Sequence, residues 1–320
     1  RGYLTEGRER LKKALTHGLD APESLRARAL LGAGNLSRVQ GDYDQSIILL
    51  EDSLTLFQKT GDQYGIAMVY KELGRNYYHL GRLENARVYY SKGWKQAHEL
   101  GEKLLSARNL LGLGLINWME GNMEKAQSQF EESRHIFVEA QNRRDEAGAI
   151  SNLGIICAEM GDMEKAKTYF LKAMEIQEEI GDVDNLRNVY NNLGYLYYKL
   201  GDYTQSVHYY KKLRQLAQDA GDRRMNSTAY SGLADVYLAM GDTARALKYA
   251  QNALDEVQNI GTGIEMGVSL RVLGEVWMAS GKPDQAREFF EKSIPLLEEA
   301  RDSEELEKAR RGYKQVISLI

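Results

Sequence analysis

Few residues in this sequence have the types and spacing that catalysis, phosphate binding or metal binding requires. A phosphate-binding loop needs the pattern G-x-x-x-x-G-K-S/T, which the sequence does not contain. The strings Gly112-Leu113-Gly114 and Gly261-Thr262-Gly263 lack the third glycine of a dinucleotide-binding turn. The 5 histidines are scattered and form no H-E-x-x-H motif, so we expect no zinc site. We therefore expect a protein that is not an enzyme and that needs no metal or cofactor.

Charge and composition exclude further classes of function. The chain has 42 basic and 46 acidic residues, so no basic surplus exists to neutralise phosphates, and we expect no nucleic-acid partner. Apolar runs such as Asn109–Met119 are far too short to cross a bilayer, so we expect no membrane segment. The single Cys157 suits a reducing compartment and predicts a cytoplasmic protein. Because the sequence opens with Arg1, we interpret it as part of a longer protein.

The elements that would position a binding site follow from a repeat of 40 residues. Glycine occurs at this spacing seven times, at Gly41, Gly81, Gly121, Gly161, Gly201, Gly241 and Gly281. A second series lies midway, at Gly61, Gly101, Gly181, Gly221 and Gly261, with Gln141 and Arg301 in its two remaining positions. Glycine ends helices by taking a left-handed conformation, and the aspartates that often follow can cap the next helix. With only 3 prolines in the chain, this pattern predicts an array of helix pairs.

The sizes of the repeated residues indicate how the helices pack. The first helix of a repeat carries a pair such as Leu73-Gly74, and the second carries a small and then a large residue, such as Ala86 and Tyr90. A mid-helix glycine costs about 1 kcal/mol relative to alanine, so we expect a neighbouring helix to approach it closely. Together with the intervening Tyr77, this pattern resembles the tetratricopeptide repeat family in a long-repeat version. The resemblance implies an all-α, right-handed superhelix, or α-solenoid.

The repeat positions predict one solenoid over residues 1–320. We expect a leading half repeat, seven 40-residue helix-turn-helix repeats and a C-terminal capping helix. The predicted boundaries are 1–20 for the half repeat, 21–60, 61–100, 101–140, 141–180, 181–220, 221–260 and 261–300 for the repeats, and 301–320 for the capping helix. We expect the charged side chains of the capping helix to face water, namely Glu304, Glu305, Glu307, Lys308, Arg310 and Arg311.

Two short segments resemble a particular group of repeat proteins. Residues 1–8 and 25–34 are similar to the sensor arrays at the carboxyl end of bacterial STAND signalling ATPases and large transcriptional regulators. This resemblance implies the sensor or interaction domain of a larger signalling protein. Residues 190–194 are also similar to free-standing adaptors, such as the cell-polarity scaffold LGN and the bacterial Rap proteins, so an adaptor scaffold is an alternative.

The family resemblance also implies which residues bind a partner, because the first helix of every repeat lines a concave groove. The predicted groove residues are Arg38, Lys71, Arg75, Tyr78, Arg108, Leu111, Leu115, Trp118, Met119, Ile155, Asn188, Asn191, Tyr195, Tyr198, Asp235, Arg271 and Glu275.

These residue types favour a protein or peptide segment as the partner. We expect its apolar side chains to meet Trp118 and Tyr198 and an acidic portion to meet Arg75 and Arg108. The alternative is a small-molecule sensor, in which the Asn and Tyr side chains between residues 188 and 198 hold a carbohydrate or nucleotide. The sequence leaves open the identity of the partner and the oligomeric state.

Overall fold

The computed structural model describes residues 6–7, 10–11, 13, 20–258, 263–300 and 303–319. These residues form α-helices joined by short turns and contain no β-strand, as the sequence predicts. The predicted half repeat 1–20 lies largely outside the described residues, as do the turn positions Gly261 and Arg301.

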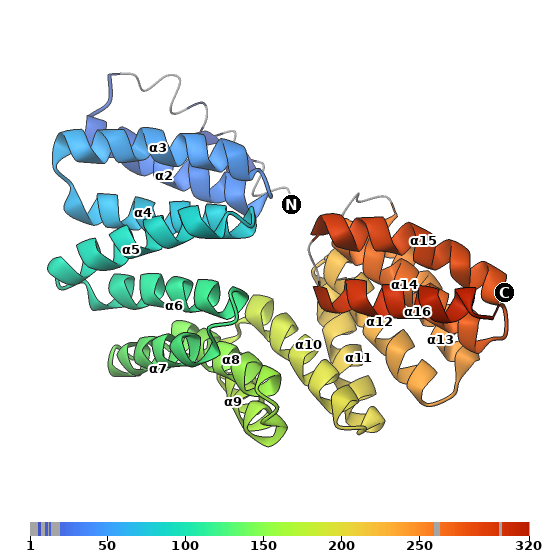
Figure 1. Cartoon of the computed structure of the whole chain (residues 1–320). Coiled ribbons are helices and arrows are strands. Elements are labelled where there is room, and N and C mark those ends of the chain that lie inside the picture. The colour runs from blue at the N-terminus through green and yellow to red at the C-terminus, as the bar shows by residue number, and fades with distance from the viewer. Residues whose placement is uncertain are drawn as a thin grey trace. The chain divides into compact units, whose positions relative to one another are not determined.

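The chain divides into two compact units, Arg1–Met160 and Gly161–Ile320, whose helices are labelled in Figure 1. The first unit contains α2 (Glu23–Val39), α3 (Tyr43–Thr60), α4 (Gln63–His79), α5 (Leu83–Glu99), α6 (Lys103–Met119), α7 (Met123–Glu139) and α8 (Arg143–Glu159). The second unit contains α9 (Met163–Ile180), α10 (Val183–Lys199), α11 (Tyr203–Asp219), α12 (Arg223–Ala239), α13 (Thr243–Val257), α14 (Gly263–Ala279), α15 (Pro283–Ala300) and α16 (Ser303–Ile317).

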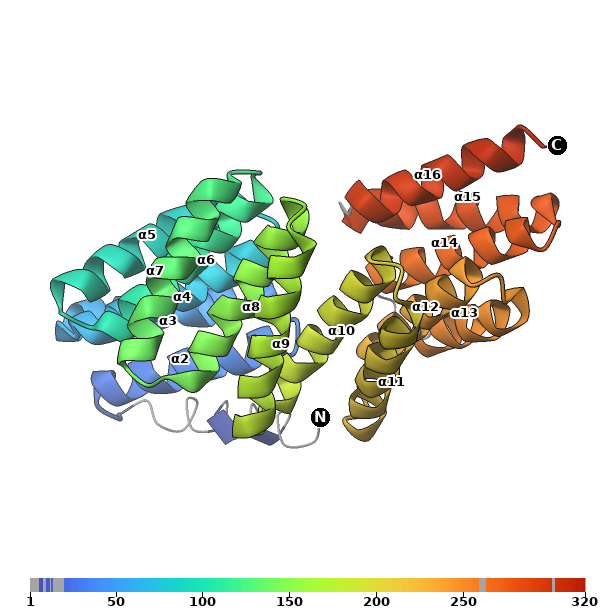
Figure 2. The same cartoon turned by 90° about the horizontal axis from the view of Figure 1, so that it is seen from below.

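Within each unit, consecutive helices pack against each other as antiparallel hairpins (Figure 2). The even-numbered helix is the first of its hairpin, and it also contacts the even-numbered helices before and after it, so that α10, α12, α14 and α16 form one layer of the second unit. A residue that faces outward from this layer therefore lies near its counterparts 40 positions away.

The turns have the conformation that the glycine series predicts. The turn glycines of both series have φ between 64° and 86° wherever they are described. Gln141, which replaces a glycine in the second series, takes a φ of 52°. Six of the aspartates that follow a turn glycine accept a hydrogen bond from the backbone N–H three residues on, as Asp62 does from Gly65 at 2.9 Å. The predicted caps thus fix where six of the described helices begin.

Aromatic rings of neighbouring helices pack against the mid-helix glycines. A Cβ atom built on Gly74 of α4 would lie 2.7 Å from the Tyr90 ring of α5, and one built on Gly112 of α6 would lie 2.5 Å from the same ring. Tyr210 lies between Gly194 and Gly232 in the same way. Each ring therefore joins its own hairpin to the next one, which confirms the predicted close approach.

Gly112 and Gly148 provide a matched test of this packing, because both are helical glycines of the first unit. We expect Gly112→Ala to lower the free energy of unfolding by about 1–3 kcal/mol, since the Tyr90 ring must shift. A Cβ on Gly148 meets no atom within 4 Å, so Gly148→Ala should raise the free energy of unfolding by up to about 1 kcal/mol. Urea denaturation measures both effects, and equal changes in the two variants would contradict the packing described.

Candidate functional site

The predicted partner-binding residues fall on the first helices of both units. Those of the first unit are Arg38 on α2, Lys71, Arg75 and Tyr78 on α4, Arg108, Leu111, Leu115, Trp118 and Met119 on α6, and Ile155 on α8. Those of the second unit are Asn188, Asn191, Tyr195 and Tyr198 on α10, Asp235 on α12, and Arg271 and Glu275 on α14.

In the first unit, three of the predicted basic residues converge on a buried carboxylate that was not predicted from the sequence. Glu72 is only 3% exposed. Its carboxylate lies 2.7 Å from Lys71 Nζ, 3.6 Å from Arg38 Nε and 3.7 Å from Arg75 Nη1. Burial alone would raise the pKa of Glu72, but the attraction of these three cations outweighs burial and lowers it. The cluster keeps a surplus of positive charge, with Arg75 as its most exposed member.

Other polar groups predicted to meet a partner already have partners within the first unit. Arg108 Nε lies 2.7 Å from Asp145 Oδ2 of α8. The Trp118 indole N–H donates a hydrogen bond to Glu159 Oε2 at 2.8 Å. An acidic partner would therefore compete with Asp145 for Arg108 and with Glu72 for Arg75, and the side chains of both arginines are partly exposed.

Some of the apolar residues predicted to line the groove of the first unit belong to the hydrophobic core. Leu111 packs against Ala107, Phe137 and Ala149, and Tyr78 packs against the cluster around Tyr90. Leu115 and Ile155 are half-buried, whereas Met119 is 53% exposed.

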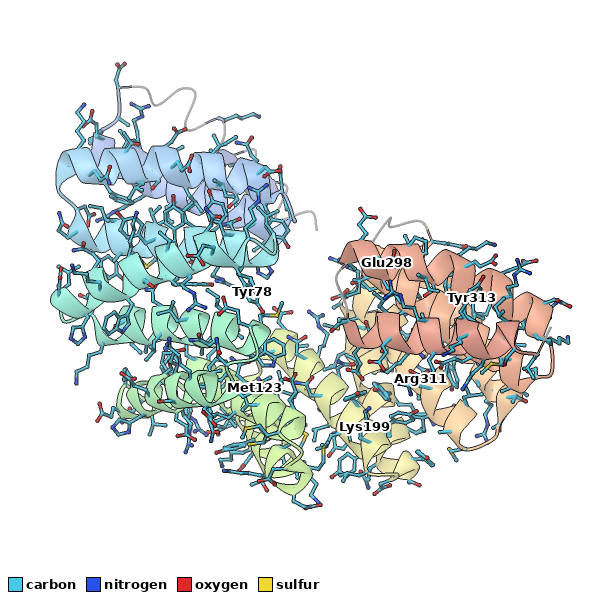
Figure 3. All side chains as sticks on the ribbon, viewed as in Figure 1. Tyr78, Met123, Lys199, Glu298, Arg311 and Tyr313 are labelled. Atoms are coloured by element: carbon cyan, nitrogen blue, oxygen red, sulfur yellow. The ribbon has the colours of Figure 1, made fainter. Side chains whose placement is uncertain are left out.

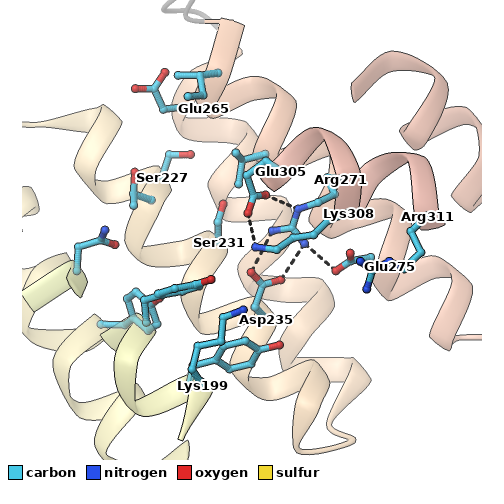
Figure 4. A pocket seen from close by; sticks show the side chains of 18 residues that line it. Lys199, Ser227, Ser231, Asp235, Glu265, Arg271, Glu275, Glu305, Lys308 and Arg311 are labelled. Atoms are coloured by element: carbon cyan, nitrogen blue, oxygen red, sulfur yellow. Dashed lines mark hydrogen bonds and ion pairs between the residues drawn. The ribbon is translucent and has the colours of Figure 1, made fainter. Parts of the chain in front are cut away.

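The second unit brings six of its seven predicted residues to one cavity of about 590 Å³ (Figure 4). These residues are Asn191, Tyr195, Tyr198, Asp235, Arg271 and Glu275. The seventh, Asn188, is exposed and is not among the lining residues. Most of the lining comes from α10, α12, α14 and α16, the layer of first helices, and Tyr210 of α11 completes it.

Arg271 holds this cavity together from within. It is 2% exposed, and its guanidinium donates hydrogen bonds to Asp235, Glu275 and Glu305, with donor–acceptor distances of 2.6–3.3 Å. These carboxylates raise the pKa of Arg271 further above its ordinary value, although burial opposes the rise. Arg271 was predicted from the sequence as a partner contact, but its charge is neutralised inside the protein. Its role in this structure is to fix α12, α14 and α16 together.

The carboxylates around Arg271 are crowded. Burial raises the pKa of Glu275 to about 7, and the nearby Asp235 and Glu305 contribute to the rise against the attraction of Arg271 and Lys308. Glu275 is thus a titratable group of the cavity near neutral pH.

Side chains also connect α10 to α16, which lie 109 residues apart at the point of contact. The Tyr195 hydroxyl donates a hydrogen bond to Glu304 Oε1 at 2.5 Å, and Lys199 Nζ lies 3.8 Å from the same oxygen. Burial, followed by the hydrogen bond to Glu304, raises the pKa of Tyr195 far above its ordinary value, so this phenol stays protonated. Lys199 and Arg311, which both line the cavity, are labelled in Figure 3.

The contribution of α16 to the site was not predicted from the sequence. Glu305 and Lys308 were expected to face water, but Lys308 Nζ lies 2.6 Å from Glu305, and both side chains line the cavity. The repeat spacing contained a signal for this. A shift of 40 residues from Val268 and Arg271 of α14 leads to Lys308 and Arg311.

A second cavity, of about 660 Å³, adjoins the first and shares Glu275, Lys308 and Arg311 with it. Its other lining residues are more apolar and include Leu238, Met278, Ala279 and Leu319. The second unit therefore offers a cavity of mixed lining next to a more apolar one.

Neither a metal-binding cluster nor a membrane-spanning helix occurs in the described part of the chain. No group of three or more His, Cys, Asp or Glu side chains among the described residues is arranged to hold a metal ion. None of the described helices has the length and apolar character needed to cross a membrane.

Comparisons with known proteins agree with this architecture. A family model for the tetratricopeptide repeat matches residues 25–93, 65–137, 145–219 and 225–299. A comparison with curated proteins finds no match. Solved structures with the same fold include the apo form of the quorum sensor NprR from B. thuringiensis, which is 16% identical with a TM-score of 0.72 over 92% of this chain and 82% of that one.

Two further similar structures come from other organisms. The Signal Transduction ATPase with Numerous Domains (STAND) protein with a tetratricopeptide repeat sensor from Pyrococcus horikoshii is 18% identical, with a TM-score of 0.68 over 93% of this chain. This chain spans 46% of the length of that protein. Aspartyl phosphate phosphatase F from Bacillus subtilis is 17% identical, with a TM-score of 0.68 over 92% of this chain and 74% of that one. Because the family model matches more than half of its residues, this chain belongs to the tetratricopeptide repeat family.

Proposed function

We propose that this chain is a non-catalytic interaction module that binds a peptide or protein segment in the cavity of the second unit. The observation that carries the proposal is the convergence of six predicted partner-binding residues, from three helices, on one cavity of about 590 Å³. Ligand sites in proteins span about 300–1,000 Å³, and they combine apolar walls with a few polar groups. This cavity has both kinds of lining.

The lining suits a peptide backbone. Asn191 lines the cavity, and its amide has both donors and an acceptor, as a peptide bond requires. The Ser231 hydroxyl also lines the cavity, is 5% exposed, and has no hydrogen-bond partner among the described residues. The adjoining cavity with Leu238 and Met278 would take apolar side chains of the same segment. Apolar burial at about 25 cal/mol per Å² would supply most of the affinity, before the cost of ordering the segment.

The similar structures support a sensing role within a larger signalling protein. Two of them are named as a quorum sensor and as a STAND protein with a repeat sensor. We extend this role to the present chain as part of the proposal, and we place the module in the cytoplasm, in keeping with a single buried cysteine. A free-standing adaptor would use the same cavity.

The predicted residues of the first unit belong to the proposal as a second contact region. Its basic cluster around Glu72 would attract an acidic partner, and Arg75 would be the first residue to meet it.

A small-molecule sensor is the second candidate, and the size of the cavity favours it. A ligand of this kind would raise the melting temperature of the chain without any peptide present.

Selection of a displayed library of random dodecapeptides against the chain tests the proposed function. The enriched peptides are synthesised, and calorimetry measures their dissociation constants. We expect Asn191→Ala to weaken binding at least tenfold, because Asn191 lines the cavity. Asn188→Ala is the matched control, since Asn188 is an exposed residue of the same helix and does not line the cavity. No enrichment, or equal binding by both variants, would contradict the proposed site.

A further inference from the structure

The charges at the centre of the cavity are not balanced. Asp235 and Glu275 form ion pairs with Arg271 and with no other cation among the described residues. The same guanidinium also bonds to Glu305. Glu305 also pairs with Lys308 at 2.6 Å, so three carboxylates face two cations, which leaves one net negative charge at the centre of the cavity.

Asp235, Glu275 and Arg271 all line the cavity, but the carboxylates are more accessible to an occupant than the guanidinium. The side chains of Asp235 and Glu275 are each 24% exposed, whereas that of Arg271 is 2% exposed. Figure 4 shows Arg271 between the carboxylates that it bonds. Tyr198 lines the same cavity as both carboxylates, and burial, followed by the charges of Asp235 and Glu275, raises the pKa of its hydroxyl. An unpaired cation that reached this point would gain charge-assisted hydrogen bonds.

Ser231 provides an independent indication of a ligand. It lies one helical turn before Asp235 on α12, is 5% exposed, and lines the cavity. Its hydroxyl makes no hydrogen bond with another described residue and can be reached from the cavity, so it is available to bond a ligand. A donor group bound between Ser231 and the two carboxylates would satisfy this oxygen as well.

We propose that the cavity selects an occupant carrying a positively charged group, the ammonium of a lysine or the guanidinium of an arginine in the bound segment, and seats it between Ser231, Asp235 and Glu275. This inference rests on the proposed function and specifies the chemistry of the segment. The segment would thus be basic at the point that enters this cavity, with apolar side chains beside it.

The surroundings of Glu275 give binding a defined dependence on pH. The charged and titratable groups that face it are Arg271 on its own helix, Asp235 on α12, Glu305 and Lys308 on α16, and Tyr198 on α10. Glu275 has a pKa of about 7, so part of the protein carries a proton there at neutral pH. A bound cation favours the ionised carboxylate, so binding releases this proton. Affinity should therefore increase as the pH rises from 6 to 8, by at most tenfold per pH unit.

The test measures the binding of the enriched peptides from the selection to the full chain. We expect them to share a lysine or arginine, and replacement of that residue by norleucine or citrulline should weaken binding at least tenfold. Glu275→Gln should weaken binding of the cationic peptide and remove the increase in affinity between pH 6 and 8. The same variant should bind the norleucine or citrulline peptide with unchanged affinity.

The outcomes separate this inference from the proposed function. Peptides that depend on Asn191 but lack a shared cation, or that bind wild type and Glu275→Gln equally at both pH values, would overturn the inference alone. If no peptide is enriched, the proposed function and this inference both fail. Asp235→Asn is a second variant, and it should lose the same affinity for the cationic peptide. Agreement between the two variants would exclude a local effect of the amide that Glu275→Gln introduces.

Discussion

Replacement of Arg271 by methionine should lower the free energy of unfolding by about 3–5 kcal/mol. Arg271 is 2% exposed and bonds three carboxylates on α12, α14 and α16, at distances of 2.6–3.3 Å. Methionine has a similar length but leaves Asp235, Glu275 and Glu305 without their shared cation in a partly buried site. The cost arises mainly from these uncompensated negative charges, so it should shrink at acidic pH, where carboxylates take up protons.

Arg287→Met is the matched control for this variant. Arg287 also forms an ion pair with a glutamate, Glu291, at 2.8 Å, but both side chains are more than 40% exposed. Exposed ion pairs contribute little, so the free energy of unfolding should change far less than in Arg271→Met. Urea denaturation, followed by hydrogen exchange of α14 and α16, measures both variants. Equal effects at Arg271 and Arg287 would show that the three-carboxylate network does not hold this layer together.

Replacement of Glu275 by glutamine should stabilise the chain at pH 8 and change little at pH 5. The pKa of Glu275 is raised from 4.5 to about 7 in the folded chain, so the folded state binds more protons than the unfolded state between these values. The stability associated with this proton is fully present below about pH 4.5 and is lost as the pH rises through 7. At about 1.4 kcal/mol per pKa unit, the wild type should lose up to about 3 kcal/mol over this window.

Glutamine keeps the shape of the protonated carboxyl group but cannot ionise, so the variant should lack this loss. Denaturant unfolding of both proteins at pH 5 and pH 8 measures the difference. Glu291→Gln serves as the control, because its hydrogen bond with Arg287 lowers the pKa of Glu291 and offsets the effect of burial, so its removal gives no gain at pH 8. A wild type whose stability does not fall between pH 5 and pH 8 would contradict the crowding of carboxylates at this site.

The repeat spacing carried most of the information about the fold. Left-handed glycines such as Gly41 and Gly161 close turns where the sequence predicts them, and Gly74 meets the Tyr90 ring that its spacing implies. Local rules of this kind depend on residues that are near each other in one or two repeats. They therefore predict helices, turns and the packing between neighbouring hairpins.

The candidate site was predicted in part, because a side chain's partners depend on charges from several helices. Asn191, Tyr195 and Tyr198, which were predicted to line the groove, lie at the cavity. The prediction of groove residues did not reveal that the charge of Arg271 is neutralised within the protein, because Glu305 comes from a helix that was interpreted only as a cap. The repeat of 40 residues also relates α14 to α16. Adding 40 to positions 268, 271, 275, 278 and 279 leads to five residues that line the two cavities, Lys308, Arg311, Gln315, Ser318 and Leu319.

The first unit shows the same limit. Trp118 and Arg108 have the residue types that dominate interfaces, yet Glu159 and Asp145 already bond their polar groups. These acids come from the next repeat, so the composition of one helix could not reveal them. The cluster around Glu72 was missed because a single acid among predicted cations has no signal in the sequence until its burial is known.

Hydrogen exchange with and without a selected peptide tests the central claim most directly, because it maps the bound segment without any substitution. We predict slower exchange in α10, α12, α14 and α16, which line the cavity of the second unit. The second helices α11 and α13 should show the smaller effect. Protection confined to those second helices, with none in the four lining helices, would contradict the proposed site.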